Sequence, residues 1–217
     1  MIYSINKPIG WTSFDVVKKI RGITREKKVG HAGTLDPFAE GVLIIGTGKD
    51  TKKLTSISSS IKSYRAILKL GKTTDTLDNE GEVTNKMEVP TFDKVKIENV
   101  LISFKGDYLH TPPMYSAKRV KGVRLYKLAR QNIVVEREPV NVSILEISLN
   151  NFNKNEIDFS VTCSKGTYIR VLGQDIAKKL GTIGYLTKLV RIEVGPYNIN
   201  NSTSIKTFEE KWKSTNR

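Results

Sequence analysis

A single carboxylate in a glycine-rich segment is the group in this chain best placed to do chemistry. Residues 30–43 read GHAGTLDPFAEGVL, so that Asp36 lies between Gly33 and Gly41. Glycine lets backbone or ligand come close, because it carries no side chain. The chain as a whole is strongly basic, which favours anionic partners. A carboxylate facing an anion is electrostatically costly, and this favours a chemical role for Asp36.

The same segment also has a structural interpretation. Asp36 precedes Pro37, and an Asp–Pro pair is a common helix start, with Asp as the N-cap and Pro at the first helical position. A capping Asp needs neither the surrounding glycines nor His31, whose ring could stack or form hydrogen bonds. The residues alone leave both interpretations open, and they differ in whether a helix begins here.

Two further side chains could serve a flat or anionic ligand. Tyr64 begins a segment of alternating hydrophobicity, where it is either an ordinary strand aromatic or a platform on which a nucleobase stacks. Arg170 lies near Tyr168 in KGTYIR, at the start of a helical segment and off its apolar stripe. It is either part of a solvated helix face or an arginine held at a strand-to-helix junction, where it would keep a nearby carboxylate ionised.

Motifs for nucleotides and metals are missing from the sequence. The pairs Gly48-Lys49 and Gly71-Lys72 lack the glycine that a phosphate-binding loop has five residues earlier. The two histidines and the single cysteine, Cys163, have no zinc-ligand spacing and allow no internal disulfide. We therefore expect no metal.

The elements that would position these residues mix strands and helices without strict alternation. The strand pattern is clearest at 64–70, with Tyr64, Ala66 and Leu68 on one face. Helical spacing predicts one helix from Thr12 or Ser13 to about Gly22, and another over 168–180. Further strands are expected at 2–6, 42–45, 133–136, 140–149, 157–163 and 186–194, further helices at 50–57, 92–104, 125–130 and from 202 on, and a polar loop at 71–82. This mixture predicts an α+β fold with a mixed, mostly antiparallel sheet.

Composition and charge narrow the class of partner. The chain has 217 residues, enough for one sizeable domain, with 36 Lys and Arg against 22 Asp and Glu and a net charge of +14. This balance favours RNA or DNA over an anionic membrane, although a merely soluble, lysine-rich surface would also produce it. The beginning of the sequence lacks the apolar run of a signal peptide, and no stretch suits a membrane span. We expect a cytoplasmic protein.

Six motifs, in order and correctly spaced, resemble those of the bacterial tRNA pseudouridine-55 synthases of the TruB type over nearly the whole chain. They are NKPIGWTSFDVV, GHAGTLDPFAEGVL, KSYRAILKLGKTTDTLDNEGEV, TPPMYSAKRVKGVRLYKLAR, CSKGTYIRVLGQDIA and LTKLVRIEVGPY. The resemblance implies the pseudouridine synthase fold, an α+β fold whose mixed, mostly antiparallel sheet is flanked by helices around a central catalytic cleft. It also implies the conversion of uridine 55 in the T-arm loop of tRNA to pseudouridine.

Catalytic roles follow from the same resemblance. Asp36 corresponds to the nucleophile, Tyr64 to the tyrosine that stacks on the target base, and Arg170 to the arginine that pairs with the aspartate. The reaction breaks the bond between ribose and N1 of the uracil and rejoins the base through C5. It involves neither redox chemistry nor group transfer, so the resemblance implies no cofactor. Whether Asp36 attacks the base or acts at the sugar is open.

Substrate-binding residues are implied in the same way. His31 corresponds to the histidine that helps to pull the target nucleotide out of its loop, Tyr168 to a pocket tyrosine and Leu189 to a leucine that lines the base pocket. After Leu189 the family often has two arginines, whereas this chain has Val190 and Arg191, which predicts a weaker phosphate contact. Lys7 belongs to the first motif, whose role looks structural.

The expected organisation is a catalytic domain over residues 1–200 and a short tail over 201–217. Many members of the family continue into a small RNA-binding module of the PUA type, and the tail is too short for a complete one. We therefore expect the catalytic domain and its charge to bind the T-arm stem-loop of tRNA. The protein would act as a monomer, without a membrane, a guide RNA or an obligate protein partner.

Three alternatives use the same residues differently. An RNA chaperone that opens the tRNA elbow would need the charge, His31 and Tyr64, but not Asp36. A guide-RNA-dependent synthase of the archaeal or eukaryotic type would depend on partner proteins and on the C-terminal module. A general basic nucleic-acid-binding domain would need none of the ordered motifs.

Overall fold

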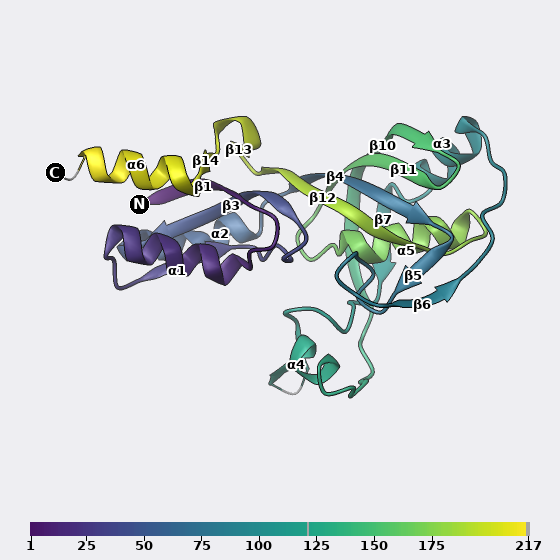
Figure 1. Ribbon diagram of the computed structural model, residues 1–217, viewed down its shortest axis with the longest axis horizontal. Coiled ribbons are helices and arrows are strands. Elements are labelled where there is room, and N and C mark those ends of the chain that lie inside the picture. Colours follow the sequence, from purple (N-terminus) through teal and green to yellow (C-terminus); the bar gives the residue numbers. More distant parts are fainter. Residues whose placement is uncertain (121, 216–217) are drawn as a thin grey trace. The chain divides into compact units, whose positions relative to one another are not determined.

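The computed structural model describes residues 1–120 and 122–215, and the chain divides into two compact units (Figure 1). Unit 1 consists of Met1–Tyr64 and Leu189–Arg217, and unit 2 of Arg65–Lys188. Two strands, β4 (Lys62–Leu70) and β12 (Gly184–Val194), run from one unit into the other. The chain therefore leaves unit 1 along β4 and returns to it along β12.

Unit 1 is built on a mixed sheet. Its strands, besides the ends of β4 and β12, are β1 (Ile2–Lys7), β2 (Val29–Ala32), β3 (Glu40–Thr47), β13 (Tyr197–Asn198) and β14 (Thr203–Ser204). β3 pairs antiparallel with β1 and β2 and parallel with β12, while β1 pairs parallel with β14. β3 is thus the central strand, and it begins directly after the segment that contains Asp36.

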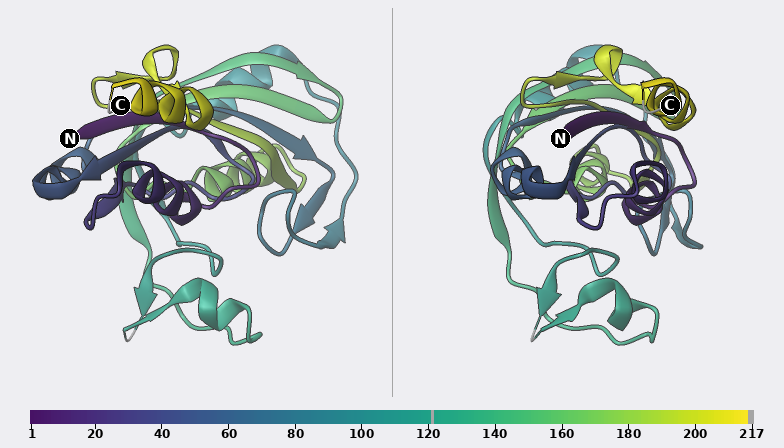
Figure 2. Two further views of the ribbon diagram at one scale, coloured as in Figure 1. Left: turned by 60° about the vertical axis from the view of Figure 1, so that its left-hand side comes forward. Right: turned by 90° about the vertical axis from the view of Figure 1, so that its left-hand side faces the viewer.

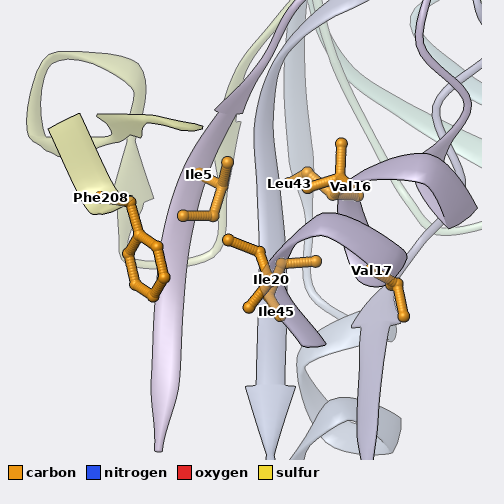
Figure 3. Close-up of a cluster of buried hydrophobic side chains, with 7 residues drawn as sticks. All are labelled: Ile5, Val16, Val17, Ile20, Leu43, Ile45 and Phe208. Carbon is orange, nitrogen blue, oxygen red and sulfur yellow. The ribbon is translucent and has the colours of Figure 1, made fainter. Parts of the chain in front are cut away.

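Alternate residues of β3 enter two different cores. Leu43 and Ile45 pack against the helices α1 (Ser13–Thr24) and α6 (Ile205–Thr215) in the cluster drawn in Figure 3. Val42 and Ile44 belong to a second cluster, which includes Leu54 of α2 (Leu54–Ser58), the helix that follows η1 (Gly48–Lys53). Because successive side chains of a strand point to opposite faces, a strand covered on both faces is apolar on both, as residues 42–45 of β3 are.

The first helix begins where the sequence predicts and ends later. Thr12 is the N-cap of α1, and it forms a reciprocal capping box with Asp15. The predicted end at Gly22 is wrong, because α1 continues to Thr24 and closes at Arg25, whose φ is +56°. The left-handed conformation that usually belongs to glycine is here adopted by an arginine.

Unit 2 combines a largely antiparallel sheet with helices. β10 (Val140–Asn153) pairs antiparallel with both β11 (Glu156–Cys163) and β7 (Gly106–His110), and β4 lies next to β11. The helices are α3 (Lys94–Ile102), α4 (Leu125–Ala129) and α5 (Ile169–Lys179). Two small ribbons complete the unit: β5 (Lys72–Thr74) with β6 (Val83–Lys86), and β8 (Arg119–Val120) with β9 (Val123–Arg124).

The mixed sheet with flanking helices confirms the predicted α+β fold, but several local predictions are wrong. Residues 133–136 form no strand, and Ile133 and Val134 are 45% and 78% exposed there. The predicted loop at 71–82 contains β5, which pairs with the wholly exposed β6. The helix expected from 202 on is present as α6, which follows the short strand β14 and buries Phe208. Among the described residues, no helix is long and apolar enough to cross a membrane.

Candidate active site

Asp36 lies in a turn between β2 and β3. The amide of Ala39 donates to the carbonyl of Asp36 at 3.1 Å, and the chain enters β3 at Glu40. Residues 36–39 therefore form a reverse turn, in which the fixed φ of Pro37 suits the second position. The interpretation of Asp36 as a helix cap is wrong. Its side chain is partly exposed in a segment that is otherwise held from several sides.

Arg191 holds the segment before Asp36. This arginine of β12 is 1% exposed, and its Nη2 donates to the carbonyl of Gly33 at 3.1 Å. Nη1 donates to the carbonyl of Thr34 at 3.4 Å, and Nε to that of Val42 at 2.7 Å. The family resemblance associates Arg191 with a phosphate contact, but its guanidinium donates to backbone carbonyls. It fixes the path of the chain into and out of the Asp36 turn.

Lys7 and Ser13 hold the same turn from the other side. The ammonium group of Lys7, which is 0% exposed, donates to the carbonyls of Pro8, Trp11 and Pro37 at 2.9, 2.6 and 3.4 Å. The hydroxyl of Ser13 donates to the carbonyl of Leu35 at 3.1 Å and accepts from its amide at 2.8 Å. The residues immediately before and after Asp36 are thus both tied to the N-terminal segment.

Gly41 is required by the approach of two strands. Arg191 pairs with Gly41 where β12 runs parallel to β3, and the φ of Gly41 is +108°. A Cβ atom at this position would lie 2.3 Å from the carbonyl oxygen of Arg191. The glycine that follows Asp36 therefore admits another backbone, which is one of the two uses that the sequence suggested for it.

Three other predicted residues lie in unit 1. His31 is on β2, opposite Ile45, and is partly exposed. Leu189 is on β12, one residue before the pairing of Val190 with Glu40, and is 5% exposed. Tyr64 is on β4 and is 8% exposed, on the buried face that the alternation predicts.

Arg170 is buried in unit 2 at the start of α5. Its residue exposure is 3%, so the interpretation as a solvated helix face is wrong. One terminal nitrogen, Nη2, donates to the carbonyl of Tyr115 at 2.8 Å, and Nη1 donates to that of Thr76. Nη1 also lies 3.4 Å from Oδ2 of Asp78, whose side chain is 4% exposed. The guanidinium is therefore oriented by several acceptors at once.

Asp78 is the residue beside Arg170 that the sequence motifs did not single out. Its Oδ1 accepts from the hydroxyl of Thr76 at 2.6 Å and from the amide of Glu80 at 3.1 Å, which leaves Oδ2 to face Arg170. Leu77, which precedes it, has a φ of +63°, a conformation that is uncommon for a residue with a side chain. The run of Thr, Asp and Asn in TTDTLDN, typical of side-chain-stabilised turns, was the available signal.

Tyr168 is the N-cap residue of α5, and its ring contacts that of His110. Its amide donates to Nε2 of His110 at 3.4 Å, and the two rings meet edge to face with centroids 5.8 Å apart. His110 is 3% exposed and stacks on Tyr108 at 5.1 Å. Burial lowers the pKa of His110, against the opposing charge of Asp175, so the imidazole is kept neutral.

The predicted residues thus fall into two groups. Four belong to unit 1 and two to unit 2: His31, Asp36, Tyr64 and Leu189, and then Tyr168 and Arg170. Within the parts of the chain that the structure describes, no group of three or more His, Cys, Asp or Glu residues has an arrangement suited to a metal ion. Together the two groups contain the carboxylate of Asp36 on a fixed turn, the oriented guanidinium of Arg170 and aromatic rings.

Comparison with protein families identifies the family of the chain. Residues 21–169 match the N-terminal domain of the TruB family of pseudouridylate synthases, a range that includes His31, Asp36 and Tyr64. The chain belongs to this family. Its reaction is therefore the isomerisation of uridine to pseudouridine, and the family confirms the resemblance seen in the sequence motifs.

Curated relatives extend the match over almost the whole chain. A tRNA pseudouridine synthase B of Clostridium tetani is 45% identical over 210 residues, which cover 97% of this chain and 73% of the relative. Its counterpart in Clostridium kluyveri is 46% identical over 210 residues, covering 97% of this chain and 72% of the relative. One from Dehalococcoides mccartyi is 44% identical over 208 residues, covering 96% and 69%.

Solved structures confirm the fold. A crystal structure of a Cbf5–Nop10–Gar1 complex contains a chain that superposes with a TM-score of 0.78 at 24% identity, covering 100% of this chain and 56% of that one. An H/ACA ribonucleoprotein bound to a substrate RNA gives a TM-score of 0.74 at 22% identity, covering 100% and 55%. At this level of identity the likeness establishes the pseudouridine synthase fold alone.

Proposed function

We propose that this protein converts uridine 55 in the T-arm loop of tRNA to pseudouridine, with Asp36 as the nucleophile. Membership of the family gives the reaction class, and the relatives named tRNA pseudouridine synthase B support tRNA as the substrate. The observation that carries the role of Asp36 is its setting. Arg191, Lys7 and Ser13 fix the backbone on both sides of a partly exposed carboxylate that caps no helix.

The reaction needs little more than a positioned carboxylate. The bond between C1′ of the ribose and N1 of the uracil breaks, and a bond from C1′ to C5 forms. The proton that C5 loses is balanced by one that N1 gains, so the product is an isomer of the substrate. A carboxylate can form a covalent intermediate or stabilise the developing charge. We assign to Arg170, which lies 3.4 Å from Asp78, the supply of positive charge for Asp36, as the resemblance implies.

The target nucleotide must leave its loop before it can react. Extruding a base costs a few kcal/mol. Stacking on an aromatic ring returns about 1–3 kcal/mol, which is comparable. We assign this stacking to Tyr64, the filling of the vacated space to His31, and the walls of the base pocket to Tyr168 and Leu189. Contacts of Lys and Arg with phosphates supply the remaining affinity in a chain with a net charge of +14. The protein acts as a monomer with tRNA as its partner, in the cytoplasm.

A minimal substrate tests the proposal directly. An unmodified T-arm stem-loop is incubated with the protein and no added cofactor, and pseudouridine is mapped by chemical labelling. We expect product at the position equivalent to 55, and none from Asp36→Asn in a single-turnover assay, although that variant still binds RNA. Asp107→Asn, the same charge change at an exposed position of β7, serves as the control. Normal product from Asp36→Asn would refute the nucleophilic role.

Tyr64→Leu tests the stacking role. The substitution keeps a buried apolar side chain on β4, so the fold should survive while the reaction slows by about 5- to 150-fold, the equivalent of ~1–3 kcal/mol of lost stacking. Thermal unfolding and single-turnover rates separate the two effects. Tyr185→Leu, at a partly buried tyrosine of β12 in unit 2, is the matched control. A wild-type rate for Tyr64→Leu would mean that the ring only packs the strand.

A further inference from the structure

A groove in unit 1 follows α1 and α6 and holds both tryptophans of the chain. The two helices lie side by side in both views of Figure 2, and Lys19 of α1 is paired with Glu209 of α6 at 2.6 Å. The groove encloses about 1140 Å³, and Trp11 and Trp212 are among its lining residues. None of the residues to which we assign catalysis or base binding lines it.

The charge of this groove is positive and partly unneutralised. Its lining contains four basic side chains and two acidic ones. Glu209 accepts from Lys19 and also from Lys213 at 2.9 Å, and these cations lower the pKa of Glu209 to about 2. Lys18 and Arg25 are exposed, and neither forms an ion pair within the described residues. Two exposed cations therefore line the same groove as the two tryptophans.

One end of the groove adjoins the Asp36 turn. Gly10, which lines the groove, donates its amide to the carbonyl of Pro37 at 2.8 Å, and the carbonyl of Trp11 accepts from Lys7. The other end is at Arg25, beyond the last turn of α1. Because α1 has 12 residues, the groove extends roughly 18 Å from the turn. A polyanion that reaches Asp36 can thus continue along it.

We propose that this groove binds the phosphodiester backbone of the substrate RNA beside the target nucleotide. Lys18 and Arg25 contact phosphates. The exposed parts of Trp11 and Trp212, whose remaining surface packs on the core and, for Trp212, on Phe208, contact sugars or bases. A basic groove with aromatic faces is the usual arrangement for a nucleic-acid strand. The proposal rests on the proposed function, since it assumes that the substrate is an RNA delivered to Asp36. It assigns RNA binding to the basic segment KKIRGITREKK, which covers the end of α1 and the following loop.

The salt dependence of RNA binding tests the role of the two cations. Each phosphate contact contributes about 0.9 to the slope of log K against log salt, so Lys18→Ala/Arg25→Ala should lower the slope by about 2 and raise the KM for tRNA several-fold. Lys206→Ala/Lys211→Ala removes the same charge from exposed positions of α6 outside the groove lining, and should leave the slope within about 0.5 of wild type. Equal slopes for the two double variants would overturn the proposal.

Intrinsic fluorescence locates the RNA, because both tryptophans of the chain line the groove. In Asp36→Asn, which binds without turnover, a T-arm stem-loop with flanking nucleotides should quench the fluorescence saturably, and the Lys18→Ala/Arg25→Ala change should shift the titration to higher RNA. Free tryptophan controls for absorption by the RNA. Unchanged fluorescence at saturating RNA would place the strand elsewhere.

The outcomes also separate this proposal from the proposed function. Saturable quenching by RNA without pseudouridine in any substrate would refute the function and support the groove. Pseudouridine with an unaltered salt slope would do the reverse. If sedimentation shows that the protein is a dimer which Lys18→Ala/Arg25→Ala dissociates, while RNA binding is unaltered, the groove belongs to a second copy and the proposal fails.

Discussion

The two units hold their candidate catalytic groups in opposite ways. In unit 1 the clamping contacts fall on the main chain, because carbonyls on both sides of Asp36 accept from Arg191 and Lys7. In unit 2 they fall on the side chain itself, because the guanidinium of Arg170 donates to two carbonyls and faces Asp78. Unit 1 fixes the position of a loop, whereas unit 2 fixes the direction of a charge.

This difference agrees with the chemical roles that we propose for Asp36 and Arg170. A carboxylate that attacks a substrate has to present an oxygen to it, so the protein gains most by fixing the backbone that carries the carboxylate. An arginine has five donors in a rigid fork, and some can be bound while the charge still acts on a neighbour. Each unit includes buried charges among these contacts, Lys7 and Arg191 in unit 1 and Asp78 with Arg170 in unit 2. Removing one partner of such a contact leaves the other unsatisfied.

The largest effect is expected from Arg191→Met, which removes the clamp of unit 1. It leaves the carbonyl of Val42 without this donor in the core, at a cost of about 1–3 kcal/mol, and removes two part-buried hydrogen bonds, to Gly33 and Thr34, of about 1 kcal/mol each. We expect the free energy of unfolding in urea to fall by about 3–5 kcal/mol, with loss of turnover in the protein that remains folded. Arg65→Met, which removes the exposed arginine from its pair with Asp158, should cost less, about 1 kcal/mol.

A loss for Arg191→Met no greater than for Arg65→Met would break the comparison. It would mean that the Asp36 turn keeps its shape without the guanidinium, and that the remaining contacts of Lys7 and Ser13 suffice.

A smaller effect is expected from Asp78→Asn in unit 2. Asparagine keeps the shape of the side chain but removes the charge that faces Arg170, so the guanidinium loses orientation while the fold persists. We expect the single-turnover rate to fall by about 10- to 100-fold, the equivalent of ~1.4–2.7 kcal/mol, with tRNA affinity little changed. Asp158→Asn removes a carboxylate that pairs with an exposed arginine in the same unit, and should turn over like wild type.

A wild-type rate for Asp78→Asn would show that the two backbone carbonyls alone orient Arg170. The structural distinction between the units would then remain, but the carboxylate would have no part in it.

The sequence identified the groups that face the chemistry better than those that hold them. Asp36 and Arg170 are carried by local motifs, whereas the contact of Arg191 with Gly33 joins positions 158 residues apart. Such a contact depends on the parallel pairing of β12 with β3, which no local pattern encodes. Asp78 was missed for a related reason: its partner is an arginine far along the chain, and its own segment is typical of a solvated turn.

Helices and strands were also predicted well where a local pattern defines them and poorly where distant pairing does. The strand at 64–70 and the helix at 168–180 were predicted to within a residue or two, because each buries one face and shows the corresponding period. The apolar run at 133–136 has a strand-like composition, but within the described residues no strand pairs with it, and Val134 is 78% exposed. Conversely, all four residues of β6 are exposed, so its sequence has no alternation of buried and exposed residues that would predict a strand paired with β5.

The smallest expected effect concerns pH and sharpens the comparison. A guanidinium group keeps its proton in proteins, so we expect no pH dependence from the contacts that Arg191 makes in unit 1. In unit 2 the amide of Tyr168 donates to a neutral His110, which a protonated imidazole could not accept. Burial lowers the pKa of His110 from its ordinary value of 6.5, outweighing Asp175, while Lys118 acts in the same direction as burial. The start of α5, and with it Arg170, thus depends on an unprotonated histidine.

The sign of the pH effect follows from proton uptake. Between the lowered pKa of the folded protein and 6.5, the unfolded chain binds a proton at His110 that the folded chain does not. The free energy of unfolding should therefore decrease as the pH falls below about 6.5, by at most ~1.4 kcal/mol per pH unit for one group. His110→Gln, which cannot take up the proton, should flatten this dependence, and His31→Gln is the matched control for the other histidine. Parallel curves for wild type and His110→Gln in urea unfolding from pH 7 to 5 would mean that unit 2 is held as independently of pH as unit 1.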